Sequence, residues 1–251
     1  IIVRANSAPS GWSHSIVKKK LYSIMINLAD DVMVNSNDFR REFNKNFKIK
    51  SKCIYNPFYN TKLNINYKKP LFQKKSLKIL SIGRLTEQKD HMTLLKAVKL
   101  INPANRPELV IIGKGNEYIN LKNFIISNHL HNKVKLIGYK ANAYNFIKKC
   151  DIFVLTSKYE GLPNVLLEAQ FLKKYIISSN CPTGPKEILL NGKAGDLFKI
   201  GDYKKLADYI NNYNSNKKKI KKKINYGVSK FYRFDYNLNC EKYYKFILEN
   251  F

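Results

Sequence analysis

The chain has few of the residues that mark special classes of protein. Its 251 residues include four cysteines, Cys53, Cys150, Cys181 and Cys240, and none of them forms a C-x-x-C pair. This spacing argues against a disulfide framework and against a zinc site, so we expect reduced thiols and no metal. No apolar run approaches the ~18 residues that a membrane span needs, and no signal-peptide pattern opens the sequence. We therefore expect a cytoplasmic location.

Acidic residues and arginine are also scarce. Asp and Glu number 18 against 46 Lys and Arg, which gives a formal net charge of +28, and only six of the basic residues are Arg. Such a charge raises the question of a nucleic acid or an anionic membrane as partner. Nucleic-acid readers favour Arg for base contacts, and we find no zinc finger, RNA-recognition signature or helix-turn-helix. We expect no specific nucleic-acid partner, because the Lys-rich bias is typical of an AT-rich genome.

The densest basic segment is Lys217–Lys223, with the sequence KKKIKKK, between two helical segments. A solvated helix face is the favoured interpretation. The alternative is a peripheral contact with an anionic membrane at its cytoplasmic face, because each Lys near such a surface contributes ~1 kcal/mol of attraction.

The rest of the composition, 44% apolar and 13% aromatic, is that of a globular protein. From Leu77 onward, short apolar strands alternate with amphipathic helices, which predicts a parallel sheet covered on both faces. The predicted strands are 77–83, 108–113, 133–138, 151–157, 175–179 and 195–200. The predicted helices are 91–101, 117–129, 141–149, 164–173, 185–191 and 203–212. The fold class is α/β, with a Rossmann-like, doubly wound domain over 77–230, and ligand sites are expected just after the strand ends.

The first 58 residues alternate in the same way but hold too few strands for a covered sheet. Strands are predicted over 1–5, 31–35 and 51–55, with helices over 15–27 and 38–44. We interpret 1–58 as the last part of a second Rossmann-like domain. Since the sequence has no initiator Met and opens on a strand, we expect it to begin inside a longer protein. Residues 59–76 are predicted to be a linker, and 231–251 one helix with Tyr243, Phe246 and Ile247 on one face.

Two carboxylates form the strongest candidate site. Glu160 follows the strand at 151–157, and Glu168 lies more than one turn inside the next helix. Gly161 and Pro163 suit a tight turn into a helix that begins at Pro163, whose free N–H groups could meet a phosphate or sugar oxygen. Carboxylates accept hydrogen bonds from the vicinal hydroxyls of a ribose or hexose. The alternative is a surface helix with acidic residues near its N-terminus.

A second candidate follows the first strand of the same domain. Gly83 and Arg84 end that strand, and Lys89 comes five residues after Arg84. A guanidinium and an ammonium at a strand end suit a diphosphate. Two solvated cations are the alternative, although Arg is scarce in this chain.

Together these motifs resemble the C-terminal domain of the retaining, nucleotide-sugar-dependent glycosyltransferases of GT-B fold, glycosyltransferase family 4 (glycosyl transferases group 1). The resemblance is strong over about 81–202 and includes the family's Glu-x7-Glu spacing at Glu160 and Glu168. Its segments are SIGRLTEQKD at 81–90, LVIIGKG at 109–115, VKLIGY at 134–139, SKYEGLPNVLLEA at 157–169 and CPTGPKEIL at 181–189. Gly113 and Gly115 lack the third glycine of a dinucleotide fingerprint, which argues against a dehydrogenase.

The resemblance implies roles for single residues. Arg84 and Lys89 bind the diphosphate and stabilise the leaving nucleotide, which removes the need for a metal. Glu160 holds hydroxyls of the donor sugar, and Glu168 those of the ribose. The implied catalytic residues are therefore Glu160, Arg84 and Lys89. The implied donor-binding set, in which Gly138 and Tyr139 line the nucleobase pocket, is Gly83, Arg84, Lys89, Gly138, Tyr139, Glu160, Gly161, Leu162, Pro163, Asn164, Val165 and Glu168.

The resemblance also implies an activity. The expected reaction moves a hexose or N-acetylhexosamine, with retention, from a nucleotide-diphosphate sugar, expected to be UDP-linked, to a glycan or lipid-linked acceptor. Bacterial surface polysaccharide or lipopolysaccharide synthesis is the expected setting. Family enzymes carry acceptor-side residues in their N-terminal domain, so Arg4, Asn6 and Ser7 are expected to border the acceptor cleft. The final helix is expected to cross back onto that domain.

Three alternatives remain open. The chain could be a catalytically incomplete fragment that binds a nucleotide sugar, or a polyanion-binding protein. A GT-B sugar-nucleotide epimerase is disfavoured by the spacing of Glu160 and Glu168.

Overall fold

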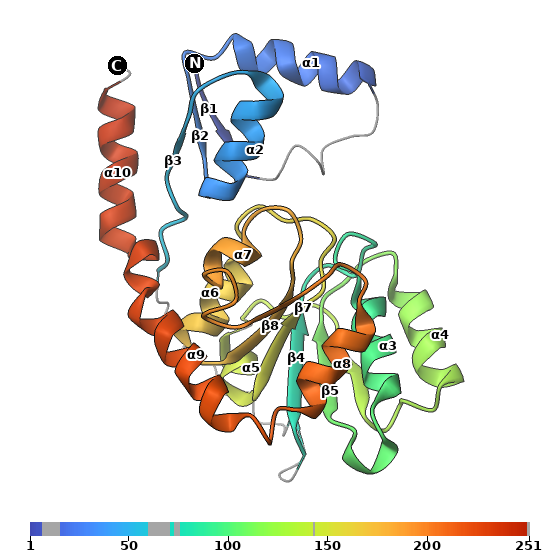
Figure 1. Cartoon of the computed structure of the whole chain (residues 1–251). Coiled ribbons are helices and arrows are strands. Elements are labelled where there is room, and N and C mark those ends of the chain that lie inside the picture. Colours follow the sequence, from blue (N-terminus) through green and yellow to red (C-terminus); the bar gives the residue numbers. More distant parts are fainter. Residues whose placement is uncertain (7–15, 60–70, 73–75, 143, 250–251) are drawn as a thin grey trace.

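The computed structural model describes residues 1–6, 16–59, 71–72, 76–142 and 144–249. Two separate parallel sheets organise these residues. We call the three-stranded sheet with its two helices, residues 1–58, the small unit, and the six-stranded sheet with its helices, residues 76–230, the large unit. Figure 1 shows the small unit above the large one. Most of the predicted linker at 59–76, and Ser7, lie outside the described residues.

The large unit has the strand order β6-β5-β4-β7-β8-β9, and all of its pairs are parallel. The chain starts in the middle at β4, moves outward to β6, and returns to β7 beside β4. This reversal makes β4 and β7 the switch point of a doubly wound sheet, and it confirms the predicted α/β fold. The strands are β4 (Lys78–Ile82), β5 (Glu108–Ile112), β6 (Val134–Leu136), β7 (Ile152–Leu155), β8 (Tyr175–Ser179) and β9 (Asp196–Phe198).

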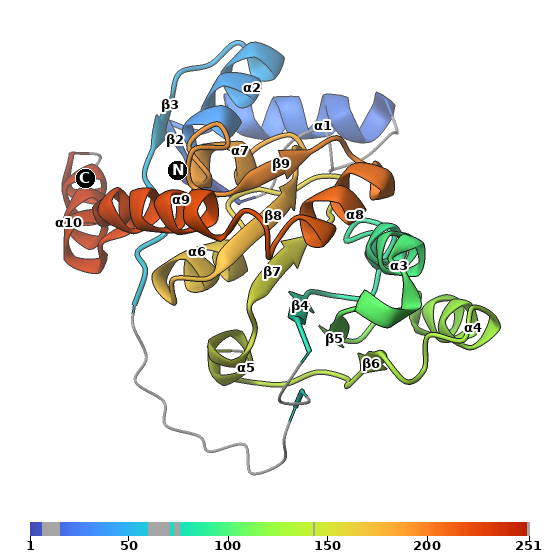
Figure 2. The ribbon, with the colours of Figure 1, turned by 60° about the horizontal axis from the view of Figure 1, so that its bottom comes forward.

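Helices cover both faces of this sheet, as Figure 2 shows. On β5, Leu109 and Ile111 face a core shared with α3, α4 and α8, whereas Val110 and Ile112 face a core shared with α5 and α6. Burial on both faces explains why the strands are continuous apolar runs. The elements are α3 (His91–Leu100), η2 (Pro103–Asn105), α4 (Tyr118–Ser127), α5 (Tyr144–Lys149), α6 (Asn164–Phe171), α7 (Pro185–Ile188), α8 (Tyr203–Asn211) and α9 (Lys217–Ser229).

The small unit is a parallel sheet of order β1-β2-β3. Its strands are β1 (Ile2–Ala5), β2 (Asp31–Val34) and β3 (Ser51–Cys53), and its helices are α1 (Ile16–Asn27) and α2 (Asn37–Phe47). Phe39 and Phe43 of α2 are fully buried in a core with Val32 and Val34. Ser36 caps α2, because its Oγ accepts a hydrogen bond from Phe39 N at 3.1 Å.

The predicted single helix over 231–251 is wrong at its start. A 3-10 turn, η3 (Phe231–Phe234), comes first, and α10 (Tyr236–Leu248) begins after Asp235, whose carboxylate accepts a hydrogen bond from Leu238 N at 2.9 Å. Tyr243 and Phe246 of α10 pack against Met33 and Ile54 of the small unit. Ile247, predicted on the same face, is 40% exposed. In Figure 1, α9 and α10 run along one side, from the large unit to the small one.

The prediction that Lys217–Lys223 lies between helices is also wrong, because this segment forms the first half of α9. Ile220 is buried there and fixes the face that α9 turns inward. Lys223 Nζ lies 2.7 Å from Asp196 Oδ1 and also donates to the carbonyls of Gly192 and Gly195. The other five lysines of the segment are exposed.

Candidate active site

The loops that follow β4 and β7 meet at the switch point of the large unit. Lys158 N donates to Gln88 O at 2.8 Å, and Gln88 Nε2 donates to Tyr159 O at 3.0 Å. Thr156 Oγ1 donates to Lys89 O at 2.9 Å. The two motifs singled out in the sequence therefore form one structure, since the carboxyl ends of neighbouring parallel strands share an edge. Gln88, which joins them, was not identified from the sequence.

Lys89 and Glu160 form an ion pair inside this structure. Lys89 Nζ lies 2.5 Å from Glu160 Oε1, with the two side chains only 15% and 8% exposed. Ser157 Oγ donates to the same oxygen at 2.6 Å. The sequence placed both charged residues in the site but did not predict that they pair. An anion that enters here competes with Glu160 for the ammonium of Lys89.

Arg84 is exposed and has a different environment. One of its guanidinium nitrogens lies 3.3 Å from Gln88 Oε1, so its charge is free to meet an incoming ligand. Gly83 packs closely beside Lys89, because a Cβ at Gly83 would lie 3.4 Å from Lys89 Cγ and Cδ. Arg84 and Lys89 thus present one exposed and one partly buried cation at the end of β4.

His91, at the start of α3, lies beneath this loop and was not identified from the sequence. It is 3% exposed, and its Nδ1 lies 3.4 Å from Ser81 Oγ. The pKa of His91 is lowered to about 4, mainly by burial and to a smaller extent by the charge of Lys89. The imidazole is therefore neutral at physiological pH and adds no cation to the site.

The turn that carries Glu160 is tightly held. Thr183 Oγ1 donates to Glu160 O at 2.5 Å. Gly184 has φ +84°, and a Cβ there would lie 2.0 Å from Gly161 O, so only glycine fits this approach. Gly161, Leu162 and Pro163 are all buried. Their burial and these contacts fix the position of the Glu160 backbone.

Helix α6 begins at Asn164, as the predicted range 164–173 has it, and Pro163 is its N-cap instead of its first helical residue. No described side chain caps its first turn. Leu166 N donates to Pro163 O at 3.0 Å, which leaves the N–H groups of Asn164 and Val165 as the donors for a ligand. Of the side chains implied in this segment, Leu162 and Val165 pack in the core, so only their backbone can meet a ligand.

Glu168, in the second turn of α6, is partly buried, and its Oε2 has no hydrogen-bond partner among the described residues. Burial raises the pKa of Glu168 to about 7. Tyr144 lies close enough to Glu168 to be affected by its charge. The pKa of the Tyr144 hydroxyl is raised, first by burial and then by the charge of Glu168. A buried acceptor oxygen without a donor suits a ligand hydroxyl.

Gly138 and Tyr139 follow β6. Gly138 has φ +69°, and a Cβ there would meet no atom within 4 Å. Its carbonyl accepts a hydrogen bond from Gly113 N at 3.0 Å, which ties the ends of β5 and β6 together. Tyr139 is 65% exposed. The space around Gly138 is therefore unoccupied by described residues, and the exposed ring of Tyr139 is available for contact with a ligand.

Asn164 connects the site to the small unit. Asn56 Nδ2 donates to Asn164 Oδ1 at 2.9 Å, and Arg4 donates to Asn56 Oδ1 at 2.9 Å. Asn6 O lies 3.4 Å from Asn35 Nδ2. Arg4, expected to border an acceptor cleft, is therefore two hydrogen bonds from the first residue of α6.

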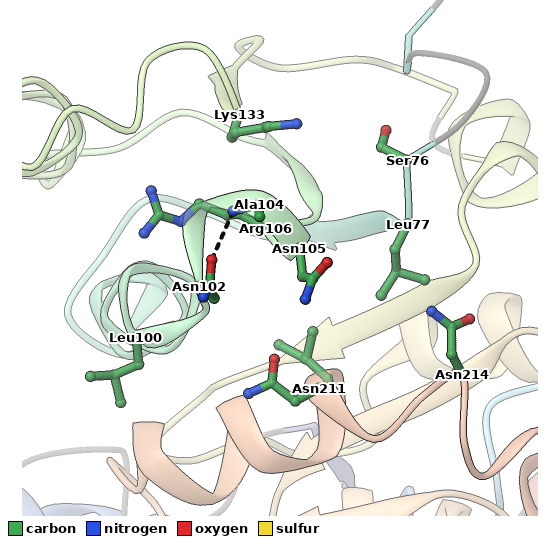
Figure 3. A pocket seen from close by; sticks show the side chains of 11 residues that line it. Ser76, Leu77, Leu100, Asn102, Ala104, Asn105, Arg106, Lys133, Asn211 and Asn214 are labelled. Atoms are coloured by element: carbon green, nitrogen blue, oxygen red, sulfur yellow. Dashed lines mark hydrogen bonds between the residues drawn. The ribbon is translucent and has the colours of Figure 1, made fainter.

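The pocket in Figure 3 is a separate feature, with a volume of about 840 Å³. It lies at the amino-terminal ends of the strands, and the figure shows asparagine side chains from η2 and α8 around it. Its polar lining includes Asn105, Arg106, Lys133, Asn211 and Asn214. None of the residues implied by the sequence lines it, so it is distinct from the candidate site.

Clusters of metal ligands, disulfides and membrane-spanning helices are absent from the described ranges. No three His, Cys, Asp or Glu side chains are grouped as a metal site there. All four cysteines are free thiols. No helix within the described ranges is long and apolar enough to cross a membrane.

Comparison with known proteins identifies the family. Residues 64–230 match the family model described as glycosyl transferases group 1. An uncharacterized glycosyltransferase of Methanocaldococcus jannaschii is 33% identical over 178 residues, which are 67% of this chain and 44% of that protein. The N-acetylgalactosamine-N,N'-diacetylbacillosaminyl-diphospho-undecaprenol 4-alpha-N-acetylgalactosaminyltransferase of Campylobacter jejuni is 28% identical over 190 residues, which are 74% of this chain and 51% of that protein. The chain thus spans about half the length of these curated relatives.

Solved structures share the fold. Anabaena HepE in complex with UDP-glucose superimposes with a TM-score of 0.83 at 19% identity, covering 99% of this chain and 72% of that one. Staphylococcus aureus TarM in complex with UDP gives 0.81 at 19% identity, covering 97% of this chain and 50% of that one. The fold is therefore GT-B, as the sequence predicted. Within that class, the chain belongs to the glycosyl transferases group 1 family.

Proposed function

We propose that this protein is a retaining glycosyltransferase whose large unit binds a UDP-linked hexose or N-acetylhexosamine. The observation that carries the proposal is the buried Lys89–Glu160 pair at the switch point. An exposed Arg84 beside this pair and the unpartnered oxygen of Glu168 on α6 complete a set suited to diphosphate, sugar and ribose. HepE with UDP-glucose and TarM with UDP provide support from proteins of the same fold.

In this proposal the donor rearranges the ion pair. The diphosphate takes Lys89 and Arg84 as partners, and Glu160 turns its freed acceptor oxygen to the sugar hydroxyls. Glu168 accepts hydrogen bonds from the ribose, and Gly138 and Tyr139 meet the base. The bond from the anomeric carbon to the diphosphate oxygen breaks through an oxocarbenium-like state, the acceptor oxygen bonds to the same face, and the proton of the acceptor hydroxyl passes to the departing diphosphate. The two cations stabilise the departing diphosphate, so no metal is required.

We further propose that 77–230 is the donor domain and 1–58 part of the acceptor-side domain, joined by 59–76, with α10 returning to the small unit. Arg4 then faces a glycan or lipid-linked acceptor. Relatives named for capsular polysaccharide, amylovoran and lipopolysaccharide core biosynthesis favour bacterial surface glycans as the setting. The enzyme works in the cytoplasm, peripherally at the inner face of the plasma membrane, where the exposed lysines of α9 meet anionic lipid.

The first test is a titration with UDP, with GDP as competitor, at a salt concentration that suppresses nonspecific charge binding. Saturable binding that is lost in Glu168→Ala but kept in Asp208→Ala supports the donor site. Asp208 is a suitable control because it is an exposed carboxylate on α8 of the same unit. Equal binding by all three proteins, or no UDP binding by the protein expressed from its complete gene, contradicts the proposal. UDP binding without transfer from any donor favours the incomplete-fragment alternative.

A further inference from the structure

Glu187 of α7 reaches out of the large unit into the small one. Its Oε1 accepts hydrogen bonds from Asn37 N at 3.0 Å, from Asn37 Nδ2 at 3.1 Å and from Tyr55 Oη at 2.5 Å. Its Oε2 accepts from Asp38 N at 2.9 Å. One carboxylate therefore receives four hydrogen bonds from residues at least 132 positions away in the chain.

Two partners of Glu187, Asn37 and Asp38, are the first residues of α2. The cap residue Ser36 uses its hydroxyl on Phe39 N, so it leaves the amides of Asn37 and Asp38 to be satisfied by another group. Glu187 supplies that group, and its negative charge suits a helix N-terminus. The carboxyl of Asp38 lies near that of Glu187, and the two negative charges repel each other. The pKa of Asp38 is raised, first by burial and then by the charge of Glu187.

The other end of α7 is attached to the candidate active site. Gly184, its N-cap, packs against Gly161 O, and the preceding Thr183 hydroxyl donates to Glu160 O. Arg233 donates to the carbonyls of Glu187 and Ile188 at 3.3 and 3.4 Å, which holds the far end of α7. A continuous set of contacts thus runs from the turn of Glu160, through α7, to the start of α2.

We propose that Glu187 is a positioning residue that sets the small unit, and with it the acceptor, against the donor site. This inference rests on the proposed function. Glu187 does not touch the donor in this arrangement, so its removal leaves nucleotide binding intact and lowers the rate of transfer. Tyr55, whose ring packs against Phe234 at 5.0 Å, acts through its hydroxyl on Glu187.

The test uses Glu187→Gln and Tyr55→Phe in the protein expressed from its complete gene. Gln keeps the shape but replaces one acceptor oxygen with an NH2 group that cannot accept from the α2 amides. In Glu187→Gln, amide hydrogen exchange should rise at least about 10-fold at whichever of Asn37 and Asp38 faces the new NH2 group, while Phe39, held by Ser36, keeps its protection. This readout does not depend on activity.

Kinetics supply the second readout. Glu187→Gln should lower the turnover number for transfer about 10-fold with less than about a twofold change in UDP affinity, and Tyr55→Phe should have a smaller effect of the same kind. Glu241→Gln, an exposed carboxylate change on α10, should match the wild type. Unchanged exchange, or unchanged turnover despite faster exchange, overturns the inference. Absence of UDP binding in the wild type instead overturns the proposed function.

Discussion

The ammonium of Lys89 and the carboxylate of Glu160 face each other at 2.5 Å where both side chains are largely shielded from water. Removing one member of a buried pair leaves the other charge uncompensated. Lys89→Met should therefore lower the free energy of unfolding by about 3 kcal/mol, measured by urea denaturation. The double variant Lys89→Met/Glu160→Gln should recover much of this loss. A double variant as unstable as the sum of the single variants would show that the two charges do not interact.

Arg84 should matter for binding and not for folding. Its guanidinium is exposed and donates a hydrogen bond to Gln88 Oε1 at 3.3 Å. Arg84→Ala should change the free energy of unfolding by less than about 0.5 kcal/mol. The Kd for UDP should rise about 10- to 100-fold, because a charge-assisted hydrogen bond contributes about 1.5–3 kcal/mol. Arg41→Ala, which removes an exposed Arg of the small unit, is the control. Equal losses in both variants would indicate nonspecific charge attraction.

The raised pKa of Glu168, about 7 instead of 4.5, predicts a pH dependence. The folded chain keeps the proton more firmly than the unfolded chain, so stability falls as pH rises from about 4.5 to about 7. Glu168→Gln removes this effect. Compared with the wild type, it should gain up to ~2 kcal/mol at pH 8, allowing for solvent contact, and nothing at pH 4.5. Urea denaturation at both pH values checks this, and a gain independent of pH would refute it.

Gly184→Ala should be far more damaging than Gly201→Ala. Both glycines have positive φ, +84° and +77°, so both changes add backbone strain of about 1 kcal/mol. A Cβ at Gly201 meets nothing within 4 Å, whereas one at Gly184 meets Gly161 O at 2.0 Å and Pro163 Cδ at 2.7 Å. Thermal unfolding and transfer rate should both be affected more at Gly184. Similar melting temperatures would argue against a tight turn at Glu160.

The exposed lysines of α9 should serve membrane binding, whereas Lys223 should serve stability. Replacing Lys217, Lys218, Lys219, Lys221 and Lys222 by Gln should abolish sedimentation with anionic vesicles at low salt and leave stability unchanged. Lys223→Gln should retain most vesicle binding and lose about 2 kcal/mol of stability, because Lys223 and Asp196 are each only 17% exposed. If the wild-type protein fails to sediment with these vesicles, the membrane contact is refuted.

Local patterns in the sequence were sufficient to predict the fold of the large unit. Apolar strands alternating with amphipathic helices predicted the doubly wound sheet, and the resemblance to the group 1 glycosyltransferases assigned Lys89 and Glu160 to one donor site. The start of α10 was missed although Asp235 is a typical N-cap residue. No helix was assigned over 217–229, because six lysines masked the four-residue spacing of Ile220 and Ile224, although the favoured interpretation of the lysines as a solvated helix face was correct.

Contacts between distant residues could not be predicted in this way. Glu187 stood within a motif that was recognised, yet its partners in α2 depend on how the two units pack, and no local period encodes that packing. The pairing of Lys89 with Glu160 likewise depends on loop conformations set by Gln88 and Thr183. Sequence patterns identify which residues can do chemistry, whereas their partners follow from tertiary structure.

The chain passes between the two units twice, and the two passages are joined. Phe58 N donates to Phe234 O at 2.9 Å, and Phe58 pairs with Asp235 in a parallel bridge. The rings of Phe58 and Phe231 pack edge to face at 5.1 Å. The two passages are therefore mechanically coupled. Cleavage of one by a protease leaves the units connected by the other, and a rotation of one unit against the other deforms both passages together.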